Sequence, residues 1–256
     1  MAFIKRTAKL ALFGVVLCAP VAFLSVHARL PLVVDGDFEA DRTGKQLRRN
    51  EKGQGWYESR NKPGRPGKKL LKLSKKNIGG NATHKAMIKG DPCCNTYLSQ
   101  DFPAPIEDRL SLQWDIYVKS ILPPYNRSAF QMIGNASVKG RGPNGTGAER
   151  FVFLAFQNSS QEGKMDLFAF EGTGASWDER RVLVPGLLLR KWYTIRVDVD
   201  VKEGTYLVSV QGVTEKPIEV KAFRWKGKFP KKLTHISFAS WNDGPGTFYI
   251  DNVREP

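Results

Sequence analysis

The chain has 256 residues and a basic composition, with 40 Lys and Arg against 25 Asp and Glu and a formal net charge of +15. It contains 3 cysteines and 3 histidines, which excludes a disulfide-rich scaffold. The positive charge can attract acidic polysaccharide, an anionic cell surface or nucleic acid, and does not choose among them.

Residues 1–28 carry the features of a secretory signal peptide. Three basic residues precede an apolar run from Leu10 to Leu24, and Ala28 ends an acceptable cleavage pattern. Cleavage there would leave residues 29–256, so we expect a secreted or periplasmic protein of bacterial type. The alternative is an uncleaved anchor, although the run is shorter than the ~20 residues of a membrane-spanning helix.

The expected mature chain suits one domain, because β-sandwiches reach roughly 200–250 residues as a single unit. Loss of the leader lowers Lys plus Arg from 40 to 37 against 25 Asp plus Glu, so the net charge is +12. No later segment is apolar and long enough to cross a bilayer. We expect a monomer, and export favours polysaccharide over nucleic acid as its anionic partner.

Cys93 and Cys94 are the only cysteines that follow the leader. Because they are adjacent, they cannot close a long loop, and they do not suit a zinc site, which uses separated ligand pairs. Export favours oxidation. A vicinal disulfide, two free thiols and an intermolecular bridge all stay open.

Alternating apolar and polar residues predict a series of half-buried strands. Between Leu110 and Val118 every second residue is Leu, Trp, Ile or Val, and polar residues or Tyr stand between them. The same pattern runs from Ile195 to Val201. Further strands are predicted at Phe151–Gln157, Met165–Glu171, Tyr206–Gln211, Ile218–Phe223, His235–Ala239 and Thr247–Val253.

Turn signals separate these strands. Glu203-Gly204 fits a hairpin turn, and residues 243–246 read Asp-Gly-Pro-Gly. No stretch after the leader shows a helical period, and no repeat or composition break indicates a second domain. Many short strands joined by turns predict an all-β fold, either a two-sheet antiparallel β-sandwich or a barrel.

Both ends of the expected mature chain carry short segments with acidic and aromatic residues, Val34–Glu39 and Phe248–Val253. This arrangement resembles secreted jelly-roll sandwiches of the concanavalin A-like lectin/glucanase superfamily, whose first and last strands lie side by side. The resemblance implies that Glu39 and Asp251, with Asp37, hold a structural Ca²⁺ ion through oxygen ligands. From the residues alone, these acids could instead cap turns or pair with Lys and Arg.

Residues 192–212 give a second point of resemblance. Trp192, a strand containing Asp198, and Gly204 before another strand are similar to a stretch of laminin G-like and concanavalin A-like domains. The resemblance implies that Trp192 packs in the core. Trp114, on an alternating strand, is also interpreted as structural.

Aromatic residues outside the core pattern are candidates for a sugar site. Such sites combine an apolar platform with a few placed polar groups. Trp241-Asn242-Asp243 has this composition before a Gly-rich turn, and Trp177 precedes charged residues between strands. The other candidates are Trp56, Tyr57, Tyr125 and Trp225. The alternative for each ring is that it covers a sheet edge.

Two basic clusters could contact an acidic chain. Residues 62–76 hold seven Lys and Arg without an acid, and residues 221–232 hold six with three aromatic residues among them. Cations with interleaved aromatic rings suit sulfated or uronic-acid chains, and also single-stranded nucleic acid. The alternative is a solvated surface that keeps the protein soluble.

Evidence for a glycoside hydrolase is sparse. Such enzymes need two carboxylates placed across the scissile bond. The E-x-D-x-x-E pattern of concanavalin A-like hydrolases is absent, and Asp166 and Glu171 face opposite sides of one predicted strand.

A polysaccharide lyase would need a group that neutralises the uronate and a base. Gln131 and Arg127 could neutralise, and Tyr125 or His84 could act as base. The Gln-x-His pattern of alginate lyases lacks its histidine here, and His235 at a strand end is interpreted as structural.

The sequence therefore predicts a secreted jelly roll that binds an acidic polysaccharide without catalysis. The alternatives are a lyase acting on uronic-acid chains, and an envelope interaction protein without a sugar site.

Overall fold

The computed structural model describes residues 31–40, 47, 55–58, 70–91, 95–136, 150–171, 179–224, 231–242 and 244–256. In this part of the chain no helix is long and apolar enough to cross a membrane. The expected leader, residues 1–28, and the Cys93-Cys94 pair lie outside the described residues.

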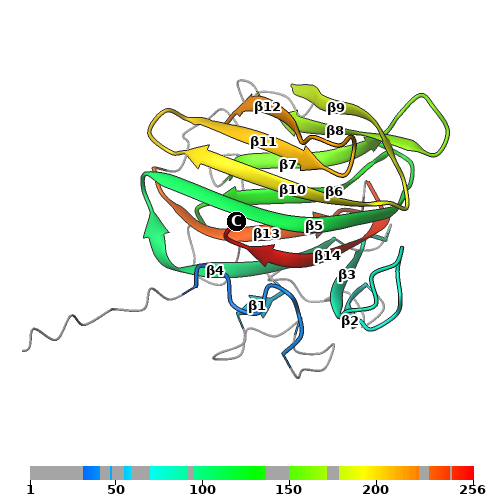
Figure 1. Cartoon of the computed structure of the whole chain (residues 1–256), viewed down its shortest axis with the longest axis horizontal. Helices are drawn as coiled ribbons and strands as arrows, with labels where there is room; N and C mark the ends of the chain where they lie inside the picture. Colours follow the sequence, from blue (N-terminus) through cyan, green and yellow to red (C-terminus); the bar gives the residue numbers. More distant parts are fainter. Residues whose placement is uncertain are drawn as a thin grey trace, which may run out of the picture. The chain divides into compact units, whose positions relative to one another are not determined.

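The described residues form fourteen strands, which are grouped in two layers (Figure 1). The strands are β1 (Trp56–Tyr57), β2 (Leu71–Ser74), β3 (Lys85–Lys89), β4 (Thr96–Ile106), β5 (Arg109–Ile121), β6 (Arg127–Gly134), β7 (Arg150–Asn158), β8 (Lys164–Phe170), β9 (Arg180–Leu188), β10 (Trp192–Asp200), β11 (Thr205–Gln211), β12 (Ile218–Phe223), β13 (Leu233–Ser240) and β14 (Gly246–Arg254).

Each layer is an antiparallel sheet of seven strands. Sheet 1 has the order β1-β4-β13-β6-β7-β8-β9, and sheet 2 has the order β12-β11-β10-β5-β14-β3-β2. In Figure 1 sheet 2 lies in front, with β5, β10 and β14 crossing the view, and β13, β6 and β7 of sheet 1 run behind it. The predicted two-sheet β-sandwich is confirmed.

The core lies between the sheets and follows the predicted alternation. The alternating apolar residues of Leu110–Val118 on β5, and those from Ile195 on β10 to Val201 just after it, all belong to one buried cluster. Trp114 is 1% exposed, and its Nε1 donates to Gln131 Oε1 at 2.8 Å. The structural interpretation of Trp114 is therefore confirmed.

Trp192 departs from the core position that the resemblance implied. It is partly buried on the outer face of sheet 2, where its ring centroid lies 5.4 Å from that of Tyr117. Its Nε1 donates to the Ile78 carbonyl at 2.7 Å. Trp192 is the first residue of β10 and faces opposite to Tyr193 and Ile195, which do pack in the core.

The six further predicted strands are all present, as β7, β8 and β11 to β14, whereas β1 to β4, β6 and β9 were not predicted. β6 is buried at all eight positions, so it has no polar face to reveal a period of two. β9 contains Pro185 and Gly186, residues that read as a turn in sequence.

The N-terminal segment lies against the last strand, although it forms no strand itself. The Val253 amide donates to the Gly36 carbonyl at 2.9 Å. A Cβ at Gly36 would stand 1.7 Å from the Val253 carbonyl oxygen, so only glycine allows this approach. The two ends of the domain therefore meet, while the sheet neighbours of β14 are β5 and β3.

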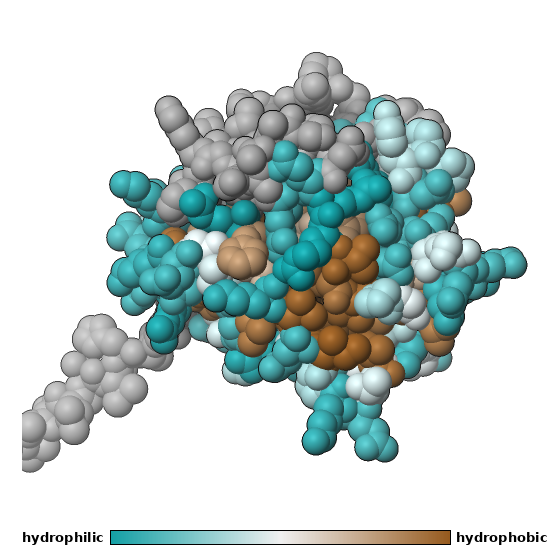
Figure 2. All heavy atoms as spheres, turned by 90° about the horizontal axis from the view of Figure 1, so that it is seen from above, coloured by the Kyte–Doolittle hydropathy of each residue, from teal (hydrophilic) through white to brown (hydrophobic). Residues whose placement is uncertain are grey.

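The edge strands β9 and β12 lie at the end of the sandwich that Figure 2 views, where apolar side chains gather. Val182 of β9 and Phe223 of β12 are 41% and 52% exposed. Glu171 links the two edges, because its Oε1 accepts from the Phe223 amide at 3.0 Å and from Arg181 Nη2 at 2.8 Å.

Candidate functional site

The outer face of sheet 1, which points away from sheet 2, carries a second apolar cluster. Its members alternate along the strands with residues of the core between the sheets, so they face the opposite way. The outer-face cluster consists of Tyr97, Phe130, Met132, Phe153, Ala155, Phe168, Phe170, Ala239 and Trp241. Strands β6, β7 and β8 are therefore apolar on both faces.

Aromatic stacking organises this cluster. The Phe130 and Trp241 rings stack with centroids 3.8 Å apart, and the Phe153 and Phe170 rings stack at 4.1 Å. Phe168 meets Phe170 edge-on at 5.0 Å. Such pairs add to the free energy gained by burial alone, and they hold the rings in a fixed arrangement.

Arginine guanidinium groups lie over these rings. The Arg150 Cζ is 4.6 Å from the Phe153 centroid and 5.4 Å from that of Trp241. The Arg127 Cζ is 5.1 Å from the Tyr125 ring and 6.0 Å from the Phe170 ring. A guanidinium within about 6 Å of a ring face is attracted by the ring's quadrupole. The outer face thus combines aromatic rings with fixed positive charge.

Arg127 reaches the outer face because of a β-bulge. Ser128 pairs with Phe156 and Gln131 with Leu154, so β6 has one more residue than β7 over this stretch. Ala129 has a φ of 53° within it. Without the extra residue Arg127 and Gln131 would share a face; with it they point to opposite faces.

A row of polar residues crosses the same face at one register position. Asp101 on β4 pairs with His235 on β13, His235 with Gly134 on β6, and Gly134 with Arg150 on β7. Gly134, which stands between His235 and Arg150 in this row, has no side chain. The Tyr57 hydroxyl donates to Asp101 Oδ1.

His235 is the buried titratable group in this row. Its Nδ1 lies 2.8 Å from Thr234 Oγ1, and among the described residues its buried Nε2 has no hydrogen-bond partner. Burial lowers the pKa of His235 to about 3. The imidazole is therefore neutral near neutral pH.

The structure separates the aromatic residues that were predicted to bind sugar. Trp241 joins the outer-face cluster and is 7% exposed, and the amide of the exposed Asn242 donates to Asn95 Oδ1 at 2.7 Å. Trp56 is buried between the sheets against Phe38, so its ring cannot stack on a sugar. Asp243, Trp225 and Trp177 lie outside the described residues, as do residues 62–69 and 225–230 of the two basic clusters.

The four residues considered for a lyase do not assemble. Arg127 and Tyr125 contact each other at the rim of the outer face. Gln131 instead lies in the core, where its Oε1 accepts from Trp114 and its Nε2 donates to the Ala129 carbonyl. His84 precedes β3 of sheet 2, and its Nδ1 is 3.1 Å from Glu39 Oε2. The bulge in β6 is the physical reason that Gln131 and Arg127 point to opposite faces of sheet 1.

Arg150, Asp101 and Tyr57 form part of the site in the structure but were not singled out as lyase or metal residues from the sequence. Arg150 begins a strand whose two faces are both apolar, and a charged residue beside such a strand was the only sign in the sequence that it could belong to a site. Its alignment with His235 through Gly134 depends on strand pairing between segments about a hundred residues apart in the chain, for which no local pattern exists.

The three acids expected to hold calcium occupy different environments. Asp251 is 1% exposed and accepts from Asn81 Nδ2 and Thr83 Oγ1. Glu39 contacts His84, whereas Asp37 is exposed and caps the Glu39 amide. Among the described residues no three His, Cys, Asp or Glu side chains are grouped to hold a metal ion.

Comparisons with known proteins identify solved structures that have a similar fold. No protein-family model matches the chain, and no curated protein sequence matches it either. The structure is similar to the catalytic domain of a glycoside hydrolase family 131 protein from Coprinopsis cinerea, with a TM-score of 0.53, 13% identity, and 88% of this chain and 93% of that one covered.

Two other solved structures are similar to this chain at the level of the fold. A carbohydrate esterase from the Shiga toxin-encoding bacteriophage phi24B has a TM-score of 0.50 and 11% identity, covering 88% of this chain and 99% of that one. A sialidase has a TM-score of 0.52 and 12% identity over 86% of this chain, which spans only 18% of the sialidase. The chain therefore shares the two-sheet jelly-roll sandwich fold of these structures.

Proposed function

We propose that this protein binds an acidic polysaccharide outside the cytoplasm, as a monomer, through the rim of the outer face of sheet 1, where Tyr125 is exposed. The observation that carries the proposal is the position of Arg127. Its guanidinium lies between the ring of Tyr125, which is 59% exposed, and that of Phe170 in the outer-face cluster. An exposed ring beside a fixed cation suits a uronic-acid residue, because the ring stacks on the pyranose and the guanidinium pairs with the carboxylate.

The charge of the chain supports an anionic ligand. The net charge of +12 after loss of the expected leader favours polyanions over neutral glucans. The similar structures are a glycoside hydrolase domain, a carbohydrate esterase and a sialidase, which agrees with a saccharide ligand.

Affinity electrophoresis of the full chain in gels containing polygalacturonate, alginate or neutral dextran tests the proposal. We expect retardation by the acidic polymers that weakens as salt is raised, and loss of retardation in Tyr125→Ala and Arg127→Gln. The control is Phe223→Ala, which removes a similarly exposed ring from the edge strand β12. Equal retardation by dextran, or unchanged retardation in both variants, would contradict the proposal.

A lyase is the second candidate, and the polar row favours it. Arg150 can neutralise a uronate, and neutral His235 can take the proton from the carbon beside the carboxylate. That electron pair then forms a carbon–carbon double bond as the glycosidic oxygen leaves with a proton. Ultraviolet absorbance of the unsaturated product, abolished in His235→Asn or Arg150→Gln, is the test. Binding without product in the wild-type protein would exclude this candidate.

A further inference from the structure

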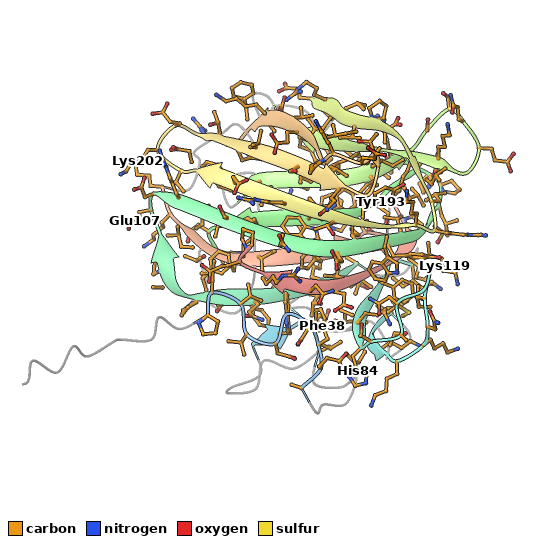
Figure 3. All side chains as sticks on the ribbon, viewed as in Figure 1. Phe38, His84, Glu107, Lys119, Tyr193 and Lys202 are labelled. Atoms are coloured by element: carbon orange, nitrogen blue, oxygen red, sulfur yellow. The ribbon has the colours of Figure 1, made fainter. Side chains whose placement is uncertain are left out.

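Lys85, the first residue of β3, has a fully buried side chain where the N-terminal segment, the β2–β3 connection and β14 meet. Its Nζ donates to the Lys76 carbonyl at 3.0 Å and to the Thr83 carbonyl. Figure 3 labels the adjacent His84 beside β2 and β3, and Phe38 marks the neighbouring N-terminal segment.

Two carboxylates from the two ends of the domain act on this ammonium group. Burial lowers the pKa of Lys85, and the negative charges of Asp251 and Glu39 act in the opposite direction. Glu39 is held in place by His84, because its Oε1 accepts from the His84 amide at 2.7 Å and its Oε2 is 3.1 Å from the ring nitrogen Nδ1.

The Asp251 carboxylate is engaged by protein donors on both of its oxygens. Its Oδ2 accepts from Asn81 Nδ2 at 2.7 Å and from Thr83 Oγ1 at 2.9 Å, and its Oδ1 accepts from the Asn252 amide at 2.8 Å. Three of the four oxygens of Asp251 and Glu39 thus accept protein hydrogen bonds, and the fourth, Glu39 Oε2, lies 3.1 Å from His84 Nδ1.

These residues do not fit a calcium ion. Two carboxylates and two backbone carbonyls are the ligands that Ca²⁺ prefers, but the ion needs about six to eight oxygens around it. Here the two carbonyls bind the ammonium of Lys85, and the carboxylate oxygens accept hydrogen bonds from the protein. A divalent ion would also be repelled by the buried ammonium.

We propose that Lys85 replaces the structural cation of this fold without a metal: its ammonium holds the β2–β3 connection through the Lys76 and Thr83 carbonyls, and Thr83 and His84 in turn bind Asp251 of β14 and Glu39 of the N-terminal segment. The resulting closure is built into the chain and independent of calcium. Shortening Lys85 leaves a buried Asp251 without its counter-charge and opens a space lined by oxygen atoms, into which a cation can enter.

Thermal unfolding of the full-length protein tests this inference. We expect the Tm of the wild-type protein to be the same in EDTA and in millimolar CaCl₂. Lys85→Ala should lower the Tm by roughly 10 °C, as the loss of a buried charge pair predicts, and CaCl₂ should restore part of that loss. The Tm of Lys85→Met should be lowered as well, but CaCl₂ should not restore it, because the methionine side chain fills the space.

The matched control is Lys75→Ala, which removes an exposed lysine from the same connection and should leave the Tm unchanged. A saturable rise of the wild-type Tm with CaCl₂ would overturn the proposal, and this arm needs no variant to fold. The proposal would also be overturned if Lys85→Ala had the same Tm as the wild type, or if its Tm were lowered and CaCl₂ restored none of the loss.

Discussion

The indole of Trp241 stacks on the phenyl ring of Phe130 with centroids 3.8 Å apart and an interplanar angle of 18°. The two residues come from β6 and the end of β13, on the face of sheet 1 that points away from the core. A sheet packed on one side only would expose this face, yet both rings are at least 93% buried. The outer face therefore contributes to stability as a second, smaller core.

Truncation of this pair should be costly. Trp241→Ala is expected to lower the free energy of unfolding by about 3–5 kcal/mol, the usual cost of removing a buried aromatic side chain. Urea denaturation monitored by circular dichroism measures it. Phe223→Ala, at a 52% exposed ring, should change stability by only about 0.5 kcal/mol. Equal effects of the two variants would show that the outer-face cluster adds little.

Replacing Arg150 with lysine tests the guanidinium–aromatic contact. Arg150 is 3% exposed and lies over Phe153 and Trp241. Lysine keeps the charge but loses the planar group, so Arg150→Lys should cost about 1–2 kcal/mol. The matched change Arg109→Lys, at a side chain 81% exposed with a surface ion pair to Asp200, should cost close to nothing. If both substitutions are silent in denaturant melts, the stacking contact is energetically unimportant.

His235 makes stability depend on pH. The folded pKa is about 3, whereas the ordinary value is 6.5. Between these values the unfolded chain binds a proton that the folded chain does not. The free energy of unfolding should therefore fall as pH drops from 6.5 toward 3, by up to about 1.4 kcal/mol per pH unit.

The comparison that isolates this contribution is His235→Asn. Urea melts of the wild-type and variant proteins at several pH values between 4 and 7, taken as approximate limits around the His titration range, give the two slopes. The variant should show a shallower decline, because carboxylates still titrate in both proteins. Parallel slopes would mean that His235 does not resist protonation in the folded state.

Gly36 is expected to be indispensable for the contact between the two ends of the domain. A Cβ there would stand 1.7 Å from the Val253 carbonyl oxygen, so Gly36→Ala must push the N-terminal segment away and break the amide–carbonyl bond. We expect a loss of about 2–3 kcal/mol. Gly80→Ala, where no atom lies within 4 Å but φ is +89°, should cost only about 1 kcal/mol of backbone strain. Thermal melts compare the two, and a smaller loss for Gly36→Ala would argue against the close approach.

The sequence by itself determined the fold class and much of the core. In Leu110–Val118 and Ile195–Val201 the period of two was enough to say which side chains face inward, because alternation is a local property of an extended chain. The same reasoning did not predict β6, because all eight of its residues are buried and the strand has no solvent-exposed polar face.

Only the tertiary structure decided which residues meet. Because β6 has one extra residue, Arg127 lies on the outer face and Gln131 in the core, and no local sequence pattern predicts such a bulge. Strand pairing aligns Asp101, His235 and Arg150 through the successive pairs β4–β13, β13–β6 and β6–β7. Likewise, Thr83 and His84 meet Asp251 and Glu39 only when both ends of the domain close on β3. Neighbours in a sandwich are set by register between distant segments, and register is a property of the assembled sheets rather than of any segment alone.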